Sequence, residues 1–141
     1  MDLSLIVARL KAQLTALRTV GASVDLDAAI DGVVALPAAF VLPMAENASD
    51  TGLVSSTFQR VVQGFAVLHC VSNRRDAQGS AAMDDLKTHR ASLRAALVGW
   101  VPDASTGEPV VFTAGRLMRL DGDGRLWWMD EFQLITYYWS P

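Results

Sequence analysis

The side chains of this sequence that could perform covalent chemistry are His69, Cys70 and His89. A histidine base beside a cysteine thiol is one arrangement that activates a nucleophile. The surrounding residues favour a β-strand, however, and neighbouring strand residues point to opposite faces of a sheet. His69 and Cys70 therefore cannot act on one another, and nothing in the spacing requires His89 to approach Cys70. We expect a buried cysteine, two ordinary histidines and no catalytic residue.

Asp121 and Asp123 alternate with glycines and resemble the start of a calcium-binding loop. An EF-hand that began at Asp121 would need an acidic residue at its twelfth position, where this chain has Phe132. The stretch Asp121–Gly124 is instead typical of a tight turn. Two histidines and one cysteine at unrelated spacings make no zinc pattern, and neither common phosphate-binding glycine motif occurs. We therefore expect neither a metal nor a cofactor.

The composition favours a protein that associates with other subunits. The chain has 141 residues, enough for one domain with a real core, and 51% of them are hydrophobic. A domain of this size cannot cover so much apolar surface alone, so we expect partner subunits to cover part of it. The formal net charge is -3, which argues against a nucleic-acid binder built on a basic face.

The single cysteine and the apolar runs bear on where the protein works. One cysteine allows no disulfide within the chain, which suits a reducing cytoplasm. The first residues lack the basic region of a secretory signal. The longest apolar run, about 33–45, is too short to span a bilayer and contains Pro37 and Pro43. We expect no membrane partner.

Hydrophobic periodicity divides the chain into seven elements. Spacings of three and four predict helices over 2–18, about 26–36 and 80–100, with Gly21 ending the first and Pro37 stopping the second. Extended runs predict strands over 38–44, 57–72, 110–120 and 125–138. The sequence thus predicts an α+β fold. We expect a single small domain over 1–141, with a mainly antiparallel four-stranded sheet packed with two to three helices, in the order α-α-β-β-α-β-β.

Several of these elements carry finer expectations. Pro43 puts the 38–44 strand near an edge, and the small polar residues 45–56 predict a long mobile loop. From Phe65 to Val71 the 57–72 strand is largely apolar on both faces, so we expect it at the centre of the sheet. Arg90 lies within the apolar stripe of its helix and is expected to be either exposed or paired.

The last two strands predict a hairpin with a defined register. A three-residue loop at 122–124, with Gly124 in a left-handed conformation, would pair Leu120 with Leu126 and Arg119 with Trp127. The same register would place Arg116 opposite Asp130. A register shifted by one residue would instead put Arg116 beside Met129. We expect the first register, with Arg116 and Asp130 facing each other.

Two groups of side chains could serve either the fold or an interface. The dense aromatic block at the C-terminal end can be divided between core and interface, because successive strand residues face both ways; it comprises Trp127, Trp128, Tyr137, Tyr138 and Trp139. Arg74 and Arg75 lie at a charged turn, where they could be a solvated pair or interface anchors.

The chain resembles the tail terminator proteins of long-tailed, siphovirus-type bacteriophages. The resembling pieces are spread over most of its length, and their order and spacing make the match more specific than any one piece: Ile6–Leu14, Pro37–Pro43, Val71–Gly79, Leu93–Trp100, Gly115–Leu117 and Leu126–Phe132. None of them is a catalytic signature.

The resemblance implies a structural virion protein and no enzyme. Such proteins form a ring, commonly a hexamer, on the head-proximal end of the tail tube. They stop tube polymerisation and provide the docking surface for the head connector. The implied partners are other copies of the chain, the tail tube protein and a head–tail connector or stopper protein. DNA passes through the lumen without specific binding. The implied location is the virion tail, after assembly in the host cytoplasm.

From the resemblance and the apolar excess we expect a set of interface residues: Glu46, Asp50, Leu53, Arg60, Arg74, Arg75, Arg119, Trp127 and Trp139. The loop from Glu46 to Ser56 carries two acids and no base, and we expect it to project toward the tube or the lumen and to order on assembly.

Two alternatives stay open at this point. The chain could be another neck or minor tail component, such as a head–tail completion protein, because small α+β subunits look alike from sequence. It could also be a small ligand-binding domain or enzyme that uses His69, Cys70 or His89.

Overall fold

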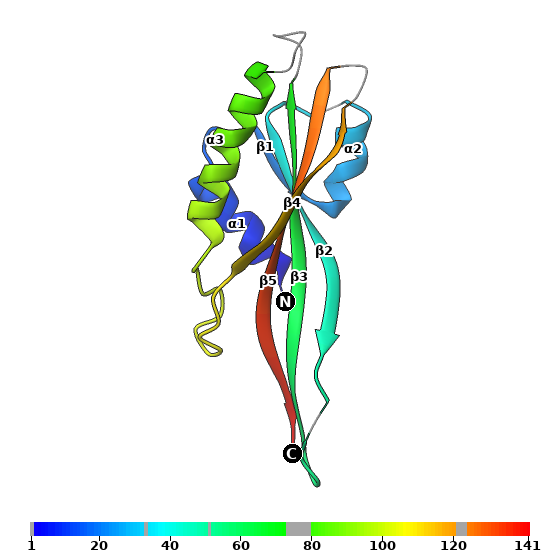
Figure 1. Cartoon of the computed structure of the whole chain (residues 1–141), viewed down its shortest axis with the longest axis vertical. Coiled ribbons are helices and arrows are strands. Elements are labelled where there is room, and N and C mark those ends of the chain that lie inside the picture. The colour runs from blue at the N-terminus through cyan, green and yellow to red at the C-terminus, as the bar shows by residue number, and fades with distance from the viewer. Residues whose placement is uncertain (1, 33, 51, 73–79, 121–123) are drawn as a thin grey trace.

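A computed structural model describes residues 2–32, 34–50, 52–72, 80–120 and 124–141 (Figure 1). Along the chain it has five strands, three α-helices and a short 3-10 turn at Ser23–Asp25. The helices are α1 (Leu3–Gln13), α2 (Leu26–Ile30) and α3 (Ser80–Leu97). The strands are β1 (Thr19–Ala22), β2 (Ala38–Ala48), β3 (Thr57–Ser72), β4 (Val111–Leu120) and β5 (Arg125–Ser140). The predicted α+β class is confirmed.

The five strands form one sheet in the order β1-β2-β3-β5-β4. All neighbours are antiparallel except β1 and β2, which are parallel. The expected sheet of four strands is therefore wrong by one strand. β1 begins directly after the range predicted for the first helix, and Gly21, which was expected to end that helix, belongs to the strand. A Cβ at Gly21 would lie 2.5 Å from Oδ2 of Asp25, so this strand fits against the turn that follows only because the residue is glycine.

Two strong predictions from periodicity are confirmed. β3 begins and ends at the predicted residues and lies in the middle of the sheet, with residues 65–71 buried. α3 begins at Ser80 as predicted and buries Leu86, Leu93 and Leu97. α1 is shorter than predicted, because the chain leaves the helical conformation at Leu14, whose φ is -97° and ψ 66°. α2 is shorter as well, since the chain turns at Gly32, whose φ is 79°.

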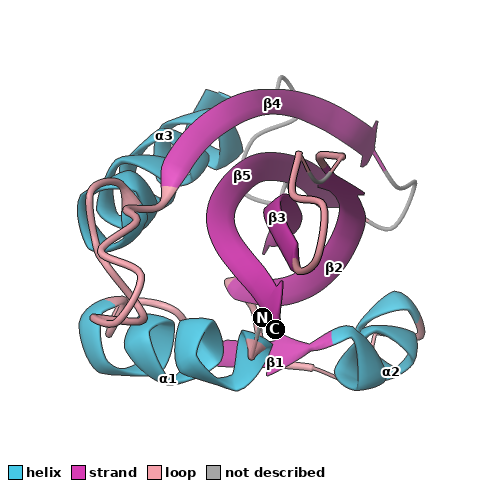
Figure 2. Ribbon diagram, turned by 90° about the horizontal axis from the view of Figure 1, so that it is seen from below, coloured by secondary structure: helices cyan, strands magenta, loops and turns pink. Residues whose placement is uncertain are grey.

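The helices divide the two faces of the sheet between them. α1 and α3 cover one face, which we call the α1/α3 face, and their core includes Ile6, Leu93, Phe65 and Phe132. α2 covers the opposite face, the α2 face, over Phe40, Cys70 and Trp127. Seen along the strands, the sheet is strongly coiled, with α1 and α3 on one side and α2 beyond β1 (Figure 2). No helix in the described ranges is long and apolar enough to cross a membrane.

The hairpin register holds beside the turn and fails farther along. Leu120 pairs with Leu126 and Arg119 with Trp127, as predicted, and Gly124 has a φ of 84°. Register shifts at Leu117/Arg119 and at Phe112/Ala114 then put Arg116 opposite Met129. Arg116 therefore does not face Asp130. It bonds Glu131 across 3.0 Å, while Asp130 points to the α1/α3 face.

Candidate assembly surface

The strands β2, β3 and β5 continue well beyond the helices and end near the C-terminus (Figure 1). We call this part the projecting sheet: β2 after Pro43, residues 57–64 of β3 and residues 133–140 of β5. On its α2 face the side chains are half-buried or exposed, because α2 packs only against the other end of the sheet. The chain thus leaves one face of a regular sheet open.

Three aromatic side chains lie on this open face and form what we call the aromatic patch: Phe58, Tyr137 and Trp139. Phe58 pairs with Trp139 across β3 and β5, and its ring stacks on Tyr137 with centroids 5.5 Å apart and planes 15° apart. Trp139 is 66% exposed. Contact of a second protein with such rings would be strongly favourable, because aromatic side chains carry much of the energy of protein interfaces.

Polar groups fix the edge of the aromatic patch. The Tyr137 hydroxyl donates to Oε1 of Glu108 at 2.7 Å, and this bond raises the pKa of Tyr137. Arg60 pairs with Tyr137 across the strands and lies within hydrogen-bonding reach of its hydroxyl. The patch therefore presents one cation among stacked rings.

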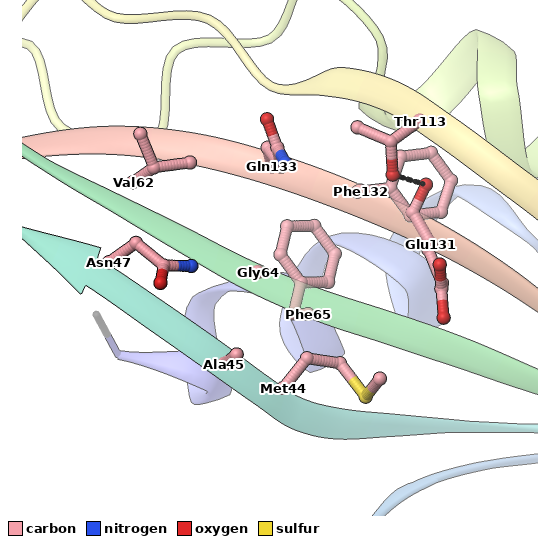
Figure 3. Close-up of a pocket in the computed structure, with 10 residues that line it drawn as sticks. All are labelled: Met44, Ala45, Asn47, Val62, Gly64, Phe65, Thr113, Glu131, Phe132 and Gln133. Atoms are coloured by element: carbon pink, nitrogen blue, oxygen red, sulfur yellow. Dashed lines mark hydrogen bonds between the residues drawn. The ribbon is translucent and has the colours of Figure 1, made fainter.

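Next to the patch, on the same face, lies a shallow hollow of about 190 Å³ between β2, β3, β5 and the start of β4 (Figure 3). Gly64 leaves room at its centre. A Cβ there would lie 3.2 Å from the Ala45 oxygen, where β2 bulges between Pro43 and Glu46. Thr113 donates to the Glu131 carbonyl at 3.1 Å and fixes the start of β4 (Figure 3).

A second apolar surface lies on the outer strand of the sheet. Among the described strands β4 pairs with β5 alone, and almost all of its residues are exposed. Five large apolar side chains are exposed on it: Val111, Phe112, Leu117, Met118 and Leu120. An edge strand of this length and character is a template for contact with another chain.

Of the three residues singled out as possible catalysts, His69 and Cys70 are in the interior and His89 is half-buried on α3. His69 and Asp130 are fully buried, with His69 Nε2 3.2 Å from Asp130 Oδ2. Cys70 is buried in the core of the α2 face, away from His69. Burial lowers the pKa of His89, and the nearby charge of His69 lowers it further. No group of three or more metal-binding side chains occurs among the described residues.

Asp130 is the centre of a buried polar cluster that joins α3 to the sheet. It accepts hydrogen bonds from Arg90 at 2.8–3.1 Å and from Trp128 Nε1 at 3.1 Å. Burial alone would raise the pKa of Asp130, but the bonds from His69, Arg90 and Trp128 lower it to about 2. Arg90 also stacks over the Trp128 ring at 4.5 Å. Arg90 is therefore paired, and this cluster holds the fold together.

The structure separates the predicted interface residues into groups. Five of them lie in the projecting sheet and its connecting loop, and all five are exposed: Glu46, Asp50, Leu53, Arg60 and Trp139. Arg119 is exposed on β4. Trp127 is 3% exposed and packs in the α2-face core, so its expected role at a surface is wrong. Arg74 and Arg75 lie outside the described residues.

The expected loop over 45–56 is also shorter than predicted. β2 runs to Ala48, and Glu46 within it accepts a hydrogen bond from Gln63 Nε2 at 2.9 Å. The strand continues because β3 offers partners beyond the bulge. Sequence reasoning missed Phe58 and Tyr137 as a stacked pair. The signal was available, because both fall on the face of Trp139 once the strand register is known.

The chain is similar to known proteins in sequence and in structure. The sequence model of the family described as "Phage tail terminator protein" matches residues 1–138. Among solved structures, a chain from "Virion of native gene transfer agent (GTA) particle" is similar, with 16% identity, a TM-score of 0.45, and coverage of 79% of this chain and 84% of that one. No curated protein matches the chain. The family match spans nearly the whole sequence, and the chain belongs to the phage tail terminator family, whose members are structural proteins of the virion.

Proposed function

We propose that this chain forms a closed ring, a hexamer by the resemblance, on the head-proximal end of the tail tube. There it stops tube polymerisation and provides the surface on which the head connector docks. The observation that carries the proposal is that one copy leaves two apolar surfaces open in different places, the aromatic patch and the outer side of β4.

Two separate surfaces suit a subunit that has neighbours of two kinds. A ring needs a heterologous contact, in which one surface of a copy meets a different surface of the next. We assign the aromatic patch to that contact, because it lies on an exposed face of the sheet with two of its rings already stacked. We assign the outer side of β4 to the tail tube protein or the connector.

The charge distribution is compatible with DNA that passes without sticking. The chain has 12 basic and 15 acidic residues. Affinity for the DNA backbone comes mainly from basic side chains that neutralise phosphates. The loop after β2 carries Asp50 and no base, so a lumen lined by it would not retain DNA.

The test is to assemble phage particles without this protein. We expect tail tubes of uncontrolled length that do not join heads, and restoration of normal length when the protein is supplied. Electron microscopy of the restored tails, with the chain labelled, should show a ring at the head-proximal end. Tails of normal length, together with label on the capsid side, would instead identify a head–tail completion protein and overturn the proposal.

A further inference from the structure

On the α1/α3 face of the projecting sheet, a hollow of about 370 Å³ lies between the start of α1, residues 102–106 and strands β3 and β5. We call it the acid-rimmed hollow. Its volume is in the range of roughly 300–1,000 Å³ with which proteins enclose small ligands. Apolar side chains such as Leu5 and Leu134 line it, together with Asp2 and Asp103. No basic residue is among the described residues that line it.

Gln63 lines this hollow and has an unused acceptor. The residue is 1% exposed, and its Nε2 donates to Glu46 at 2.9 Å and to the Tyr138 hydroxyl at 3.4 Å. Because a carboxylate only accepts hydrogen bonds, the amide nitrogen must be the atom that faces Glu46. The other amide atom, Oε1, is buried and has no partner among the described residues. Leaving such an oxygen unpaired is unfavourable.

The two carboxylates of the rim are held in place and ionised. Oδ1 of Asp2 accepts from the Ser4 N–H at 2.9 Å. Oδ1 of Asp103 accepts from the Ser105 N–H at 2.9 Å and from its hydroxyl at 2.6 Å. Hydrogen bonds from the Ser4 side chain and backbone lower the pKa of Asp2, and those from the Ser105 side chain and backbone lower the pKa of Asp103. Both bonds to Asp103 use Oδ1, so its second oxygen can accept from a ligand.

This set of groups matches one kind of side chain. The hollow offers an amide oxygen, two carboxylates and an apolar lining. Its complement is a cation that carries several N–H donors on an apolar stem, which is the chemistry of arginine. An arginine would satisfy the Gln63 oxygen, pair with Asp103 and lay its methylene groups against the apolar lining.

Resting on the ring proposed above, we propose that the acid-rimmed hollow binds Arg60 of the neighbouring copy. Arg60 precedes Gln63 by three positions in β3 and lies on the opposite face of the sheet, about 10 Å away along the strand. In a ring whose axis runs along the strands, rotation keeps every residue at its own height. The hollow extends along the strands from Gln63 to Thr136, which pairs with Val61, so its end lies within one residue of the height of Arg60 of the next copy.

The surroundings of Arg60 fit the same contact. The aromatic patch beside it is apolar and exposed, and the hollow has exposed apolar side chains such as Leu5 at its edge. A contact between the aromatic patch of one copy and the acid-rimmed hollow of the next is heterologous, because the two copies contribute different surfaces to it. Because every copy uses the same two surfaces, such contacts can close into a ring of identical copies.

Complementing charge reversals test this contact. Arg60→Asp alone and Asp103→Arg alone each put like charges together, so we expect each variant to assemble at least about tenfold more weakly than the wild-type chain. A 1:1 mixture should recover assembly, because alternating copies pair every new charge with an opposite one. Size measurement coupled to light scattering, with electron microscopy of the particles, gives the assembled fraction. Recovery of assembly can also be measured on tails, by supplying the two variants together during tail assembly.

Matched variants separate charge from folding. Asp103→Asn keeps the acceptor for Ser105, so it should fold normally and still weaken assembly several-fold. Lys87→Asp on α3 and Asp31→Arg after α2 should assemble like the wild-type chain. If the wild-type chain forms rings but the 1:1 mixture assembles no better than either variant alone, this inference is overturned and the ring proposal stays intact. Absence of a wild-type ring, both in solution and on tails, would overturn the ring proposal, and this inference with it.

Discussion

Arg90 on α3 and Asp130 in the middle of β5 form an ion pair, with Nη2 2.8 Å from Oδ1 and the carboxylate fully buried. Asp130→Asn should therefore destabilise the chain by about 3 kcal/mol, because it leaves the partly buried guanidinium of Arg90 without its counter-charge. Urea unfolding followed by circular dichroism measures the change. Asp84→Asn, on the exposed start of the same helix, should change the unfolding free energy by less than about 0.5 kcal/mol. Equal stability of the two variants would contradict the importance of the pair.

The same carboxyl group predicts a dependence of stability on pH. Its pKa falls from the ordinary value of 3.8 to about 2 in the folded chain. A lowered pKa stabilises the fold above the unfolded value, and this stabilisation is lost as the pH falls from about 4 to about 2. The loss attributable to Asp130 should be about 2 kcal/mol. In Asp130→Asn the slope over that interval should be shallower, and an unchanged slope would show that other groups produce it.

Gly115 lies on β4 directly above this cluster. A Cβ there would be 2.6 Å from Asp130 Oδ1 and 2.7 Å from Arg90 Nη2. Gly115→Ala should therefore push the pair apart and cost about 1–3 kcal/mol of stability. Gly52→Ala is the control, because a Cβ at that exposed residue would have nothing within 4 Å. Thermal unfolding of the two variants should differ by several degrees.

Arg125 attaches α2 to the sheet. It donates to the carbonyls of Ala29 and Ile30, the latter at 2.7 Å, and stacks over the Trp127 ring at 5.4 Å. Arg125→Met keeps the length and the apolar stem but removes these bonds. We expect hydrogen exchange to speed up at residues 26–30 while α3 stays protected, because charged hydrogen bonds of this kind contribute about 1.5–3 kcal/mol each. Uniform loss of protection over the chain would contradict a local role.

The two tryptophans on the α2 face of β5 should behave in opposite ways. Trp127 is 3% exposed and Trp139 is 66% exposed. Trp127→Ala should cost about 3–5 kcal/mol of folding stability. Trp139→Ala should leave the folding of one copy nearly unchanged and weaken assembly, because its ring belongs to the aromatic patch. Unfolding measurements and particle size on the same two samples distinguish these effects.

The sequence predicted the elements whose pattern was long and regular. β3 and α3 each repeat their apolar positions over many residues, so local propensity and packing agree on them. β1 could not be predicted, because four residues, Thr19–Ala22, are too few to show a period and they form a strand only by pairing with β2. The family resemblance rested instead on short pieces spread over the chain, from Ile6–Leu14 to Leu126–Phe132.

The hairpin shows why the pairing register of two strands is harder to predict than the presence of the strands. Pairing by charge and size was correct beside the turn, but one extra residue at Met118 and another at Thr113 shift the partner of each later residue. Nothing in the local pattern of β4 marks these bulges. The true partner of Asp130 is Arg90, which lies 40 residues away on a helix. Trp127 was misassigned for a related reason, since α2 covers its face and no local signal predicts that cover.

Three strands extend beyond the helices that cover the sheet, and this has an evolutionary consequence. The polar cluster and the helical layers hold the later half of β3, whereas even-numbered residues from 58 to 62 face outward at the other end. Substitutions at those outward positions leave the folding of a single copy almost untouched. Such positions can therefore vary in evolution while the scaffold of the chain stays the same.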